Sequence, residues 1–169
     1  MTTLHINTTL DDHRVAKLAA MAIGLHMLES IIPSPLPGVK PGIANIVTLY
    51  VLYRFDFATA AWVSLLRVFA SSLLFGNFLS PTFALSLSGA LMSLFILAWA
   101  QYLPKRYFSA VSLSIFAAFA HMTGQLLLVR FWLIPHTGVL YLVPIFISAA
   151  LLFGLINGLV VNALLKKAQ

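Results

Sequence analysis

The chain has 169 residues, of which 61% are hydrophobic and only 8% are charged, and its formal net charge is +6 at pH 7. Soluble globular domains carry about 25% charged residues, so this composition excludes a water-soluble fold and predicts an all-α integral membrane protein. The chain contains no cysteine, which excludes disulfides, thiol catalysis and cysteine-ligated metals.

Six hydrophobic segments follow one another along the chain, and each is predicted to be a transmembrane helix. A helix needs about 20 apolar residues to cross the bilayer. The second segment is shorter than that, so we expect it to be tilted, irregular or shielded by its neighbours. The predicted helices span residues 15–32, 42–53, 57–78, 83–103, 108–133 and 139–165, within a single domain of residues 15–167.

Two polar segments complete this organisation. Residues 1–14 have no apolar run, which predicts a polar cytoplasmic tail and not a cleavable signal peptide. Between the first two predicted helices lies PSPLPGVKPG, residues 33–42. Proline removes a backbone donor and glycine permits unusual backbone angles, so this stretch is predicted to be a defined loop.

The basic residues predict the orientation of the bundle. Lysine and arginine are enriched on the cytoplasmic side of membrane proteins, and six helices place nearly all of them on one side, leaving Lys40 and Arg130 near the other. Both termini are therefore predicted to be cytoplasmic. Because topology explains the positive charge, no nucleic-acid partner is expected. The residues on the predicted cytoplasmic side are Arg14, Lys17, Arg54, Lys105, Arg106, Lys166 and Lys167.

Polar side chains within the predicted helices gather in the outer half of the membrane. Such groups are costly in lipid and usually face the interior of the bundle. The inner half holds few besides Asn157 and Asn162, for which we expect structural roles. This asymmetry predicts an outward-facing pocket, and its net positive lining favours an anionic or strongly hydrogen-bonding small molecule. The candidate lining residues are Glu29, Lys40, Asn45, Arg67, His121 and Gln125, together with His26 and Arg130.

Structural roles compete with this interpretation. Arg67 could pair with Glu29 and hold the bundle together. His121 and Gln125 could instead bond to neighbouring helices, as polar side chains often do in membranes. His26 is expected to be a satisfied interior histidine. The sequence demands neither a metal site nor a cofactor.

The first predicted helix carries small residues four positions apart, Ala16 and Ala20. This spacing lets another helix approach closely, which makes the pair a candidate docking face for a membrane partner. Ordinary packing inside the bundle is the alternative. Solvation is the expected role of the adjacent Asp11 and Asp12 in the polar N-terminal tail. Because no GxxxxGK[ST] string is present, the chain does not hydrolyse ATP by that route.

Three strings resemble a known family. PGVKPGIANIVTLYVLY, residues 37–53, resembles the bacterial Gx transporter family, also called heptaprenyl diphosphate synthase component I. Residues 67–94 and 120–129 support the resemblance, which covers nearly the whole chain after residue 15. The family is similar to the substrate-binding S components of energy-coupling-factor (ECF) importers.

This resemblance implies a six-helix, S-component-like bundle in the bacterial cytoplasmic membrane, working with a shared transmembrane subunit and ATPases. It implies that residues 33–41 form a lid and that Ala16 and Ala20 dock the partner. It also implies that the pocket is lined by Lys40, Asn45, Arg67, His121 and Gln125.

The family's second name implies a different role, as a membrane accessory in isoprenoid or quinone metabolism. A subunit of a membrane flavin or redox assembly is a third alternative. A catalytic prenyl synthase is not expected, because such enzymes hold Mg²⁺ through clustered aspartates. The four acidic residues of this chain cannot form two facing aspartate-rich motifs.

Overall fold

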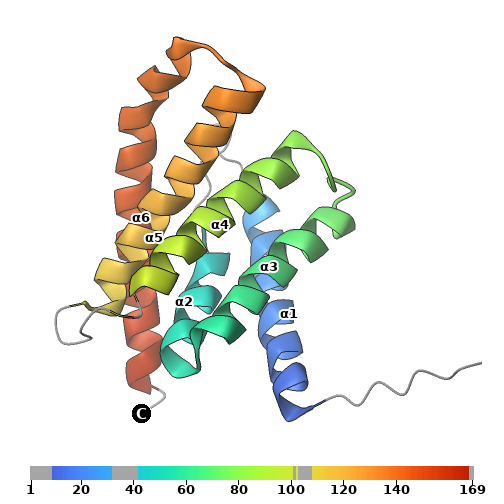
Figure 1. Ribbon diagram of the computed structural model, residues 1–169. Helices are drawn as coiled ribbons and strands as arrows, with labels where there is room; N and C mark the ends of the chain where they lie inside the picture. The colour runs from blue at the N-terminus through green and yellow to red at the C-terminus, as the bar shows by residue number, and fades with distance from the viewer. Residues whose placement is uncertain (1–8, 32–41, 101, 103–107, 168–169) are drawn as a thin grey trace, which may run out of the picture.

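The computed structural model describes residues 9–31, 42–100, 102 and 108–167, which form six α-helices and, in this part of the chain, no strand (Figure 1). Each of the six predicted helices corresponds to one of them, so the all-α prediction is confirmed. The elements are α1 (Leu10–Ile31), α2 (Ala44–Arg54), α3 (Phe57–Leu74), α4 (Pro81–Ala100), α5 (Ala110–Leu128), a π-helical turn η1 (Val129–Leu133), a 3₁₀ helix η2 (Thr137–Leu142) and α6 (Val143–Lys167).

Four segments are long and apolar enough to cross a membrane, among the residues that the structure describes: Phe57–Leu74, Pro81–Ala100, Ala110–Leu133 and Thr137–Lys167. Large apolar side chains such as Trp62 and Phe95 are exposed on their outer faces, as lipid contact requires. The 11 residues of α2 extend only about 16 Å at 1.5 Å per residue. A complete crossing by α1 and α2 therefore stays a prediction.

The helices form an arc in the order α1, α3, α4, α5 and α6, and α2 packs against α1, α3 and α6. The start of α1, the turn between α2 and α3, and the end of α6 lie at the same end of the bundle, the lower end in Figure 1. This end carries Arg14, Lys17, Arg54, Lys166 and Lys167, and we call it the basic end. Lys105 and Arg106 lie outside the described residues.

Buried apolar side chains fill the half of the bundle next to the basic end. One cluster joins α2, α4, α5 and α6 through residues such as Leu49, Leu97 and Val161. A second joins α1, α2 and α3 around Ala22 and Val63. Since both clusters consist of buried apolar side chains, the described part of this half is a packed core.

Close packing of α6 on α5 depends on two glycines spaced four residues apart. A Cβ at Gly154 would lie 2.9 Å from Cα of Ile115, and a Cβ at Gly158 would lie 2.6 Å from Cα of Val111. Small residues at this spacing bring helix backbones together in membranes. The string was visible in the sequence as GLING and was missed there.

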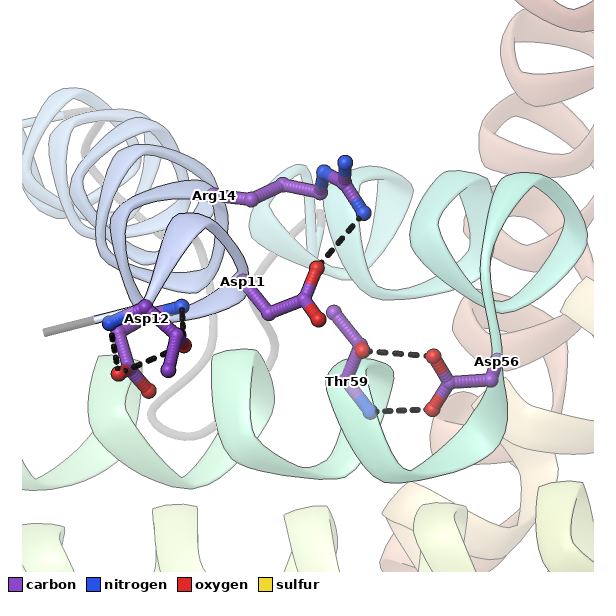
Figure 2. A network of polar contacts seen from close by, with 6 residues as sticks. Asp11, Asp12, Arg14, Asp56 and Thr59 are labelled. Carbon is purple, nitrogen blue, oxygen red and sulfur yellow. Dashed lines mark hydrogen bonds and ion pairs between the residues drawn. The ribbon is translucent and has the colours of Figure 1, made fainter.

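Helix α1 begins at Leu10, so the last residues of the predicted tail are helical. The cause is a reciprocal cap, in which Asp12 accepts hydrogen bonds from the backbone and hydroxyl of Thr9, both at 2.8 Å (Figure 2). The Thr9 hydroxyl in turn accepts from the Asp12 backbone at 3.2 Å. Asp11 forms an ion pair with Arg14 at 3.1 Å. Both aspartates are exposed, as expected of solvated groups, and the cap and the ion pair are roles that the sequence had not indicated.

The turn between α2 and α3 lies beside the start of α1. Asp56 caps α3 by accepting from the backbone and the hydroxyl of Thr59, both at 2.8 Å (Figure 2). These two hydrogen bonds, the backbone one foremost, hold the pKa of the Asp56 carboxyl below its usual value. The Arg14 guanidinium lies 5.0 Å from the ring centroid of Phe55, which joins the two segments.

Helix α3 ends at Leu74, four residues before the predicted boundary. Gly76 adopts a φ of +66°, and its N–H donates to the carbonyl of Leu73 at 3.2 Å. The N–H of Asn77 donates to the carbonyl of Ser72 at 2.8 Å. Together these bonds form the glycine-terminated cap that satisfies the last carbonyls of a helix.

Candidate functional site

A cavity of about 750 Å³ occupies the half of the bundle opposite the basic end. All six α-helices contribute lining residues, and η1 and η2 cover part of it. Its volume is within the range of about 300–1,000 Å³ that is usual for small-molecule sites. The bundle is therefore packed at one end and hollow at the other.

The cavity brings together five of the six predicted substrate-binding residues: Glu29, Asn45, Arg67, His121 and Gln125. The sixth, Lys40, lies outside the described residues, as does the predicted lid of residues 33–41. His26 also lines the cavity, but Arg130 does not. The prediction for Arg130 was wrong because the helix continues there as the π-helical turn η1, which presents Val129 and Leu133 to the cavity instead. Contact of the other residues with a ligand stays a prediction.

Arg67 projects from the middle of α3 and is only 5% exposed. Ser64 and Ser71, one turn before and one turn after it, are buried on the same face. No ion pair joins Arg67 to Glu29, although Glu29 acts on it electrostatically. Within the described part of the chain, Nε of Arg67 has no hydrogen-bond partner. The geometry thus gives no support to Arg67 as half of a structural ion pair.

The unpaired buried atoms concentrate at this cavity. An unsatisfied buried polar group costs about 1–3 kcal/mol, so each one needs an explanation. Among the residues that the structure describes, five buried side-chain atoms lack a hydrogen-bond partner, and four of them belong to residues that line the cavity: Arg67, Ser71, His121 and Gln125. A ligand with polar groups would satisfy them.

Glu29 has a different environment from Arg67. Its Oε1 accepts a hydrogen bond from the backbone N–H of Gly42, and its Oε2 lies 3.9 Å from Nδ1 of His26. The carbonyl of Gly42 accepts from Nδ2 of Asn157 at 3.2 Å. Side chains from α1 and α6 thus hold both backbone polar groups of Gly42 and fix the start of α2.

Gly42 is required at this position for a conformational reason. Its φ of +68° lies in the left-handed region, and an added Cβ would lie 3.2 Å from Nδ2 of Asn45. Because Gly42 precedes α2, fixing it also fixes Asn45 against the cavity. The Gly42 clamp, as we call the contacts of Glu29 and Asn157 with Gly42, therefore positions a predicted binding residue.

His121 and Gln125 bond to each other, with their Nε2 atoms 3.3 Å apart. The imidazole occupies space that Gly89 leaves on α4, where a Cβ would lie 2.7 Å from the ring. One atom of the Gln125 amide remains unpaired. The pair therefore presents polar groups to the cavity from the α5 side.

The remaining lining divides into two chemically different walls. The polar wall comes from α1, α3 and the start of α4, and it includes Ser72 and Thr82, which the sequence had not indicated. The apolar wall comes from the end of α5, η1, η2 and α6. Its side chains are Leu126, Val129, Leu133, Ile134, Val139, Leu142, Phe146, Ala150 and Phe153. Asn157, predicted to be structural, also reaches the lining.

Among the described residues, no group of three or more histidine and acidic side chains is arranged to hold a metal ion. His26 and Glu29 are close to each other, but the ring nitrogen and carboxylate oxygen are 3.9 Å apart. The cavity thus offers charged and hydrogen-bonding side chains.

Ala16 and Ala20, the candidate docking residues, are exposed on α1, whereas Ala19 and Ala22 are buried in the bundle. Gly24, one further turn along, has no atom within 4 Å of the position that a Cβ would occupy. The small residues at positions 16, 20 and 24 therefore form a stripe that packing among the described residues leaves open.

Comparison with known proteins places the chain in a family. The family model of heptaprenyl diphosphate synthase component I matches residues 18–164, and the chain belongs to this family. The resemblance carried by the PGVKPGIANIVTLYVLY string is thereby confirmed. No curated protein and no solved structure matches the chain.

Proposed function

From this family membership and from the cavity, we propose that the protein is a membrane-embedded binding component of a transporter. It captures a small anionic molecule in an outward-facing pocket, in the manner of an S component. Separate partner subunits supply the energy. The protein resides in a bacterial cytoplasmic membrane, with six crossings and both termini in the cytoplasm.

The observation that carries this proposal is a buried arginine that faces a cavity without an ion-pair partner among the described residues. Arg67 is 5% exposed and its Nε is unpaired. Guanidinium groups recognise carboxylates and phosphates through paired, charge-assisted hydrogen bonds. Because a charge inside the membrane is costly, an anionic ligand gives the best account of its place in the cavity.

The orientation follows from charge. Five described basic residues gather at the basic end, which the positive-inside rule assigns to the cytoplasm. The cavity then faces the outside. The chain contains no cysteine, so single cysteines report topology directly. In intact cells an impermeant maleimide should label Thr137→Cys and not Lys167→Cys, and the reverse pattern would overturn the orientation.

The stripe of small residues on α1 is the docking face in this proposal. Small residues let helix backbones approach closely, and Ala16 and Ala20 are exposed. The partner would be an ECF-type transmembrane subunit with its ATPases. A bulky side chain at position 20 should prevent this approach.

Affinity purification from native membranes tests the proposal. The wild type should retain an ATP-binding subunit together with a multi-pass membrane subunit. Ala20→Leu should lose both, whereas Met21→Phe, which adds bulk on an adjacent exposed face of α1, should retain them. If no ATPase subunit is enriched over an untagged control, the transport proposal fails.

The family name favours a second candidate, a non-catalytic membrane accessory in isoprenoid or quinone metabolism. Specific retention of a soluble prenyl synthase, without an ATPase, would favour this role. A retained flavoprotein would instead favour a subunit of a membrane redox assembly. In either case we assign no catalytic step to this chain, because only Glu29 among its four acidic residues lines the cavity.

A further inference from the structure

The two walls of the cavity constrain the ligand more narrowly than its charge does. The polar wall presents Arg67 and Ser71 from α3, and His121 and Gln125 lie on the neighbouring part of α5. The apolar wall presents Leu126 from the end of α5 and side chains from η1, η2 and α6. A ligand that fills the cavity touches both.

The apolar wall is not a consequence of the membrane environment alone. Both walls lie in the same half of the bundle, yet α3 turns Ser71 and Ser72 inward, whereas α6 turns Phe146 and Phe153 toward the cavity. The lipid-facing side chains of these helices are different residues, such as Leu73 and Leu155, and point outward. The separation of polar from apolar side chains is therefore a property of the cavity lining and not of the lipid-facing surface.

An aromatic side chain forms part of the lining on α4. Phe83 lines the cavity and is 7% exposed. Its ring centroid lies 5.4 Å from that of Phe69 and 5.1 Å from that of Phe78. Aromatic pairs at such separations stabilise each other beyond the burial of their surface, so Phe83 is held in place as a firm apolar surface.

We infer that the ligand is an amphipathic organic anion, with an anionic group bound at Arg67 and a compact aromatic or branched apolar body packed against Leu126, Phe146 and Phe153. This inference rests on the proposed binding function and names its substrate class. A wholly polar anion would leave the apolar wall in contact with water. An uncharged apolar molecule would leave the four polar groups unpaired.

The same chemistry could reach the site from two sources, a free aromatic acid or phosphate, or the head group and first carbons of an anionic bilayer lipid. The cavity recognises the shared feature, which is an anion joined to an apolar body. Protein in nanodiscs of stated composition separates the two sources, because the lipid can be changed while the added ligand is kept constant.

Binding to matched probes tests the inference, with the full chain in phosphatidylcholine nanodiscs. The amphipathic probes are 1-naphthyl phosphate, 2-naphthoate and octyl phosphate, and the fragments are inorganic phosphate and 1-naphthol. We expect at least one amphipathic probe to bind tenfold or more tightly than either fragment, which is about 1.4 kcal/mol. If phosphatidylglycerol in the nanodisc competes with the added probe for the cavity, the natural ligand is a lipid head group. That result would also support an anion joined to an apolar body.

Substitutions in the lining show which side chains contact the apolar body of the probe and which contact its anionic group. Phe153→Ala and Phe146→Ala should each weaken binding of the amphipathic probe at least fivefold, whereas Arg67→Gln should abolish the preference for the phosphate over the alcohol. The control is Phe95→Ala, which removes a ring of the same size from the outer face of α4 and should leave the affinity unchanged. If both wall variants bind like the wild type, the apolar body has no contact there and the inference is wrong.

The outcomes also separate this inference from the function on which it rests. Equal affinities for inorganic phosphate and for the amphipathic probes would reject the apolar body and leave an anion-binding component intact. Equal affinities for 1-naphthol and 1-naphthyl phosphate would reject both, because no anion is then recognised. No saturable binding of any probe at millimolar concentration would also reject both.

Discussion

Replacing Arg67 by glutamine should stabilise the ligand-free protein and destroy its binding of anions. Arg67 is 5% exposed and has no ion pair with Glu29. An arginine at the centre of a membrane helix costs about 2.5–3.5 kcal/mol on insertion scales. Some of that cost is offset by the attraction of Glu29, so we expect a net gain of about 1–2 kcal/mol in the free energy of unfolding.

The loss of binding should be large by comparison. A hydrogen bond to a charged group contributes about 1.5–3 kcal/mol, which corresponds to roughly a tenfold to hundredfold change in affinity. Reversible unfolding in mixed micelles measures the stability, and titration with 1-naphthyl phosphate measures the affinity. The control is Arg130→Gln, which removes an arginine that does not line the cavity and should leave the affinity unchanged.

A structural ion pair between Arg67 and Glu29 predicts a loss of stability in Arg67→Gln instead of a gain. If Arg67 and Glu29 hold the bundle together as an ion pair, Arg67→Gln leaves a buried carboxylate without its partner and destabilises the protein. A double-mutant cycle with Glu29→Gln would then give a coupling energy above about 1 kcal/mol. Destabilisation together with such a coupling would refute the reasoning that assigns Arg67 to the ligand.

Three further predictions concern the frame around the cavity. Gly158→Ala should lower the free energy of unfolding by about 1–3 kcal/mol, because its Cβ would lie 2.6 Å from Cα of Val111. In the same assay of reversible unfolding, Gly24→Ala, whose Cβ meets open space, should leave the protein equally stable or more stable. Gly42→Ala should cost about 1–2 kcal/mol because of its left-handed backbone, and should also weaken probe binding; unchanged binding would show that the Gly42 clamp does not position the site. The wild type should lose stability below about pH 4. The reason is that folding lowers the pKa of Asp56, so its cap on α3 is lost as the pH falls through that lowered pKa. Asp56→Asn keeps an acceptor at every pH and should show a flatter stability profile between pH 6 and 3.

The number and order of the helices could be predicted because each one is a continuous apolar segment between charged or glycine- and proline-rich breaks. Their ends could not be placed from hydropathy, because caps determine them. The reciprocal bonds of Thr9 and Asp12 extend α1 into a stretch that looks like a polar tail. Gly76 ends α3 within a run of apolar residues. Both signals are short local motifs that a hydropathy pattern does not contain.

The cavity could be anticipated from depth alone, because costly polar groups lay in one half of the predicted membrane. The serines were harder to identify. Ser72 donates to the carbonyl of Phe69 at 2.8 Å, and such local bonding makes a serine unremarkable in a membrane helix. The role of Asn157 depends on Gly42, which is 115 residues away in sequence, so no local pattern could have indicated it.

The distribution of packing within the bundle explains why the proposed transport needs other subunits. The cavity is separated from the basic end by side chains that are almost completely buried, such as Leu49, Leu97 and Val161. Backbone contacts at Gly124, Gly154 and Gly158 hold α4, α5 and α6 together, and interfaces of this kind do not deform gradually. Among the residues that the structure describes, these buried side chains thus lie between a ligand in the cavity and the basic end. In the proposed transporter, partner subunits supply the energy that opens a passage through them, and the exposed small-residue stripe of α1 is the docking face proposed for them.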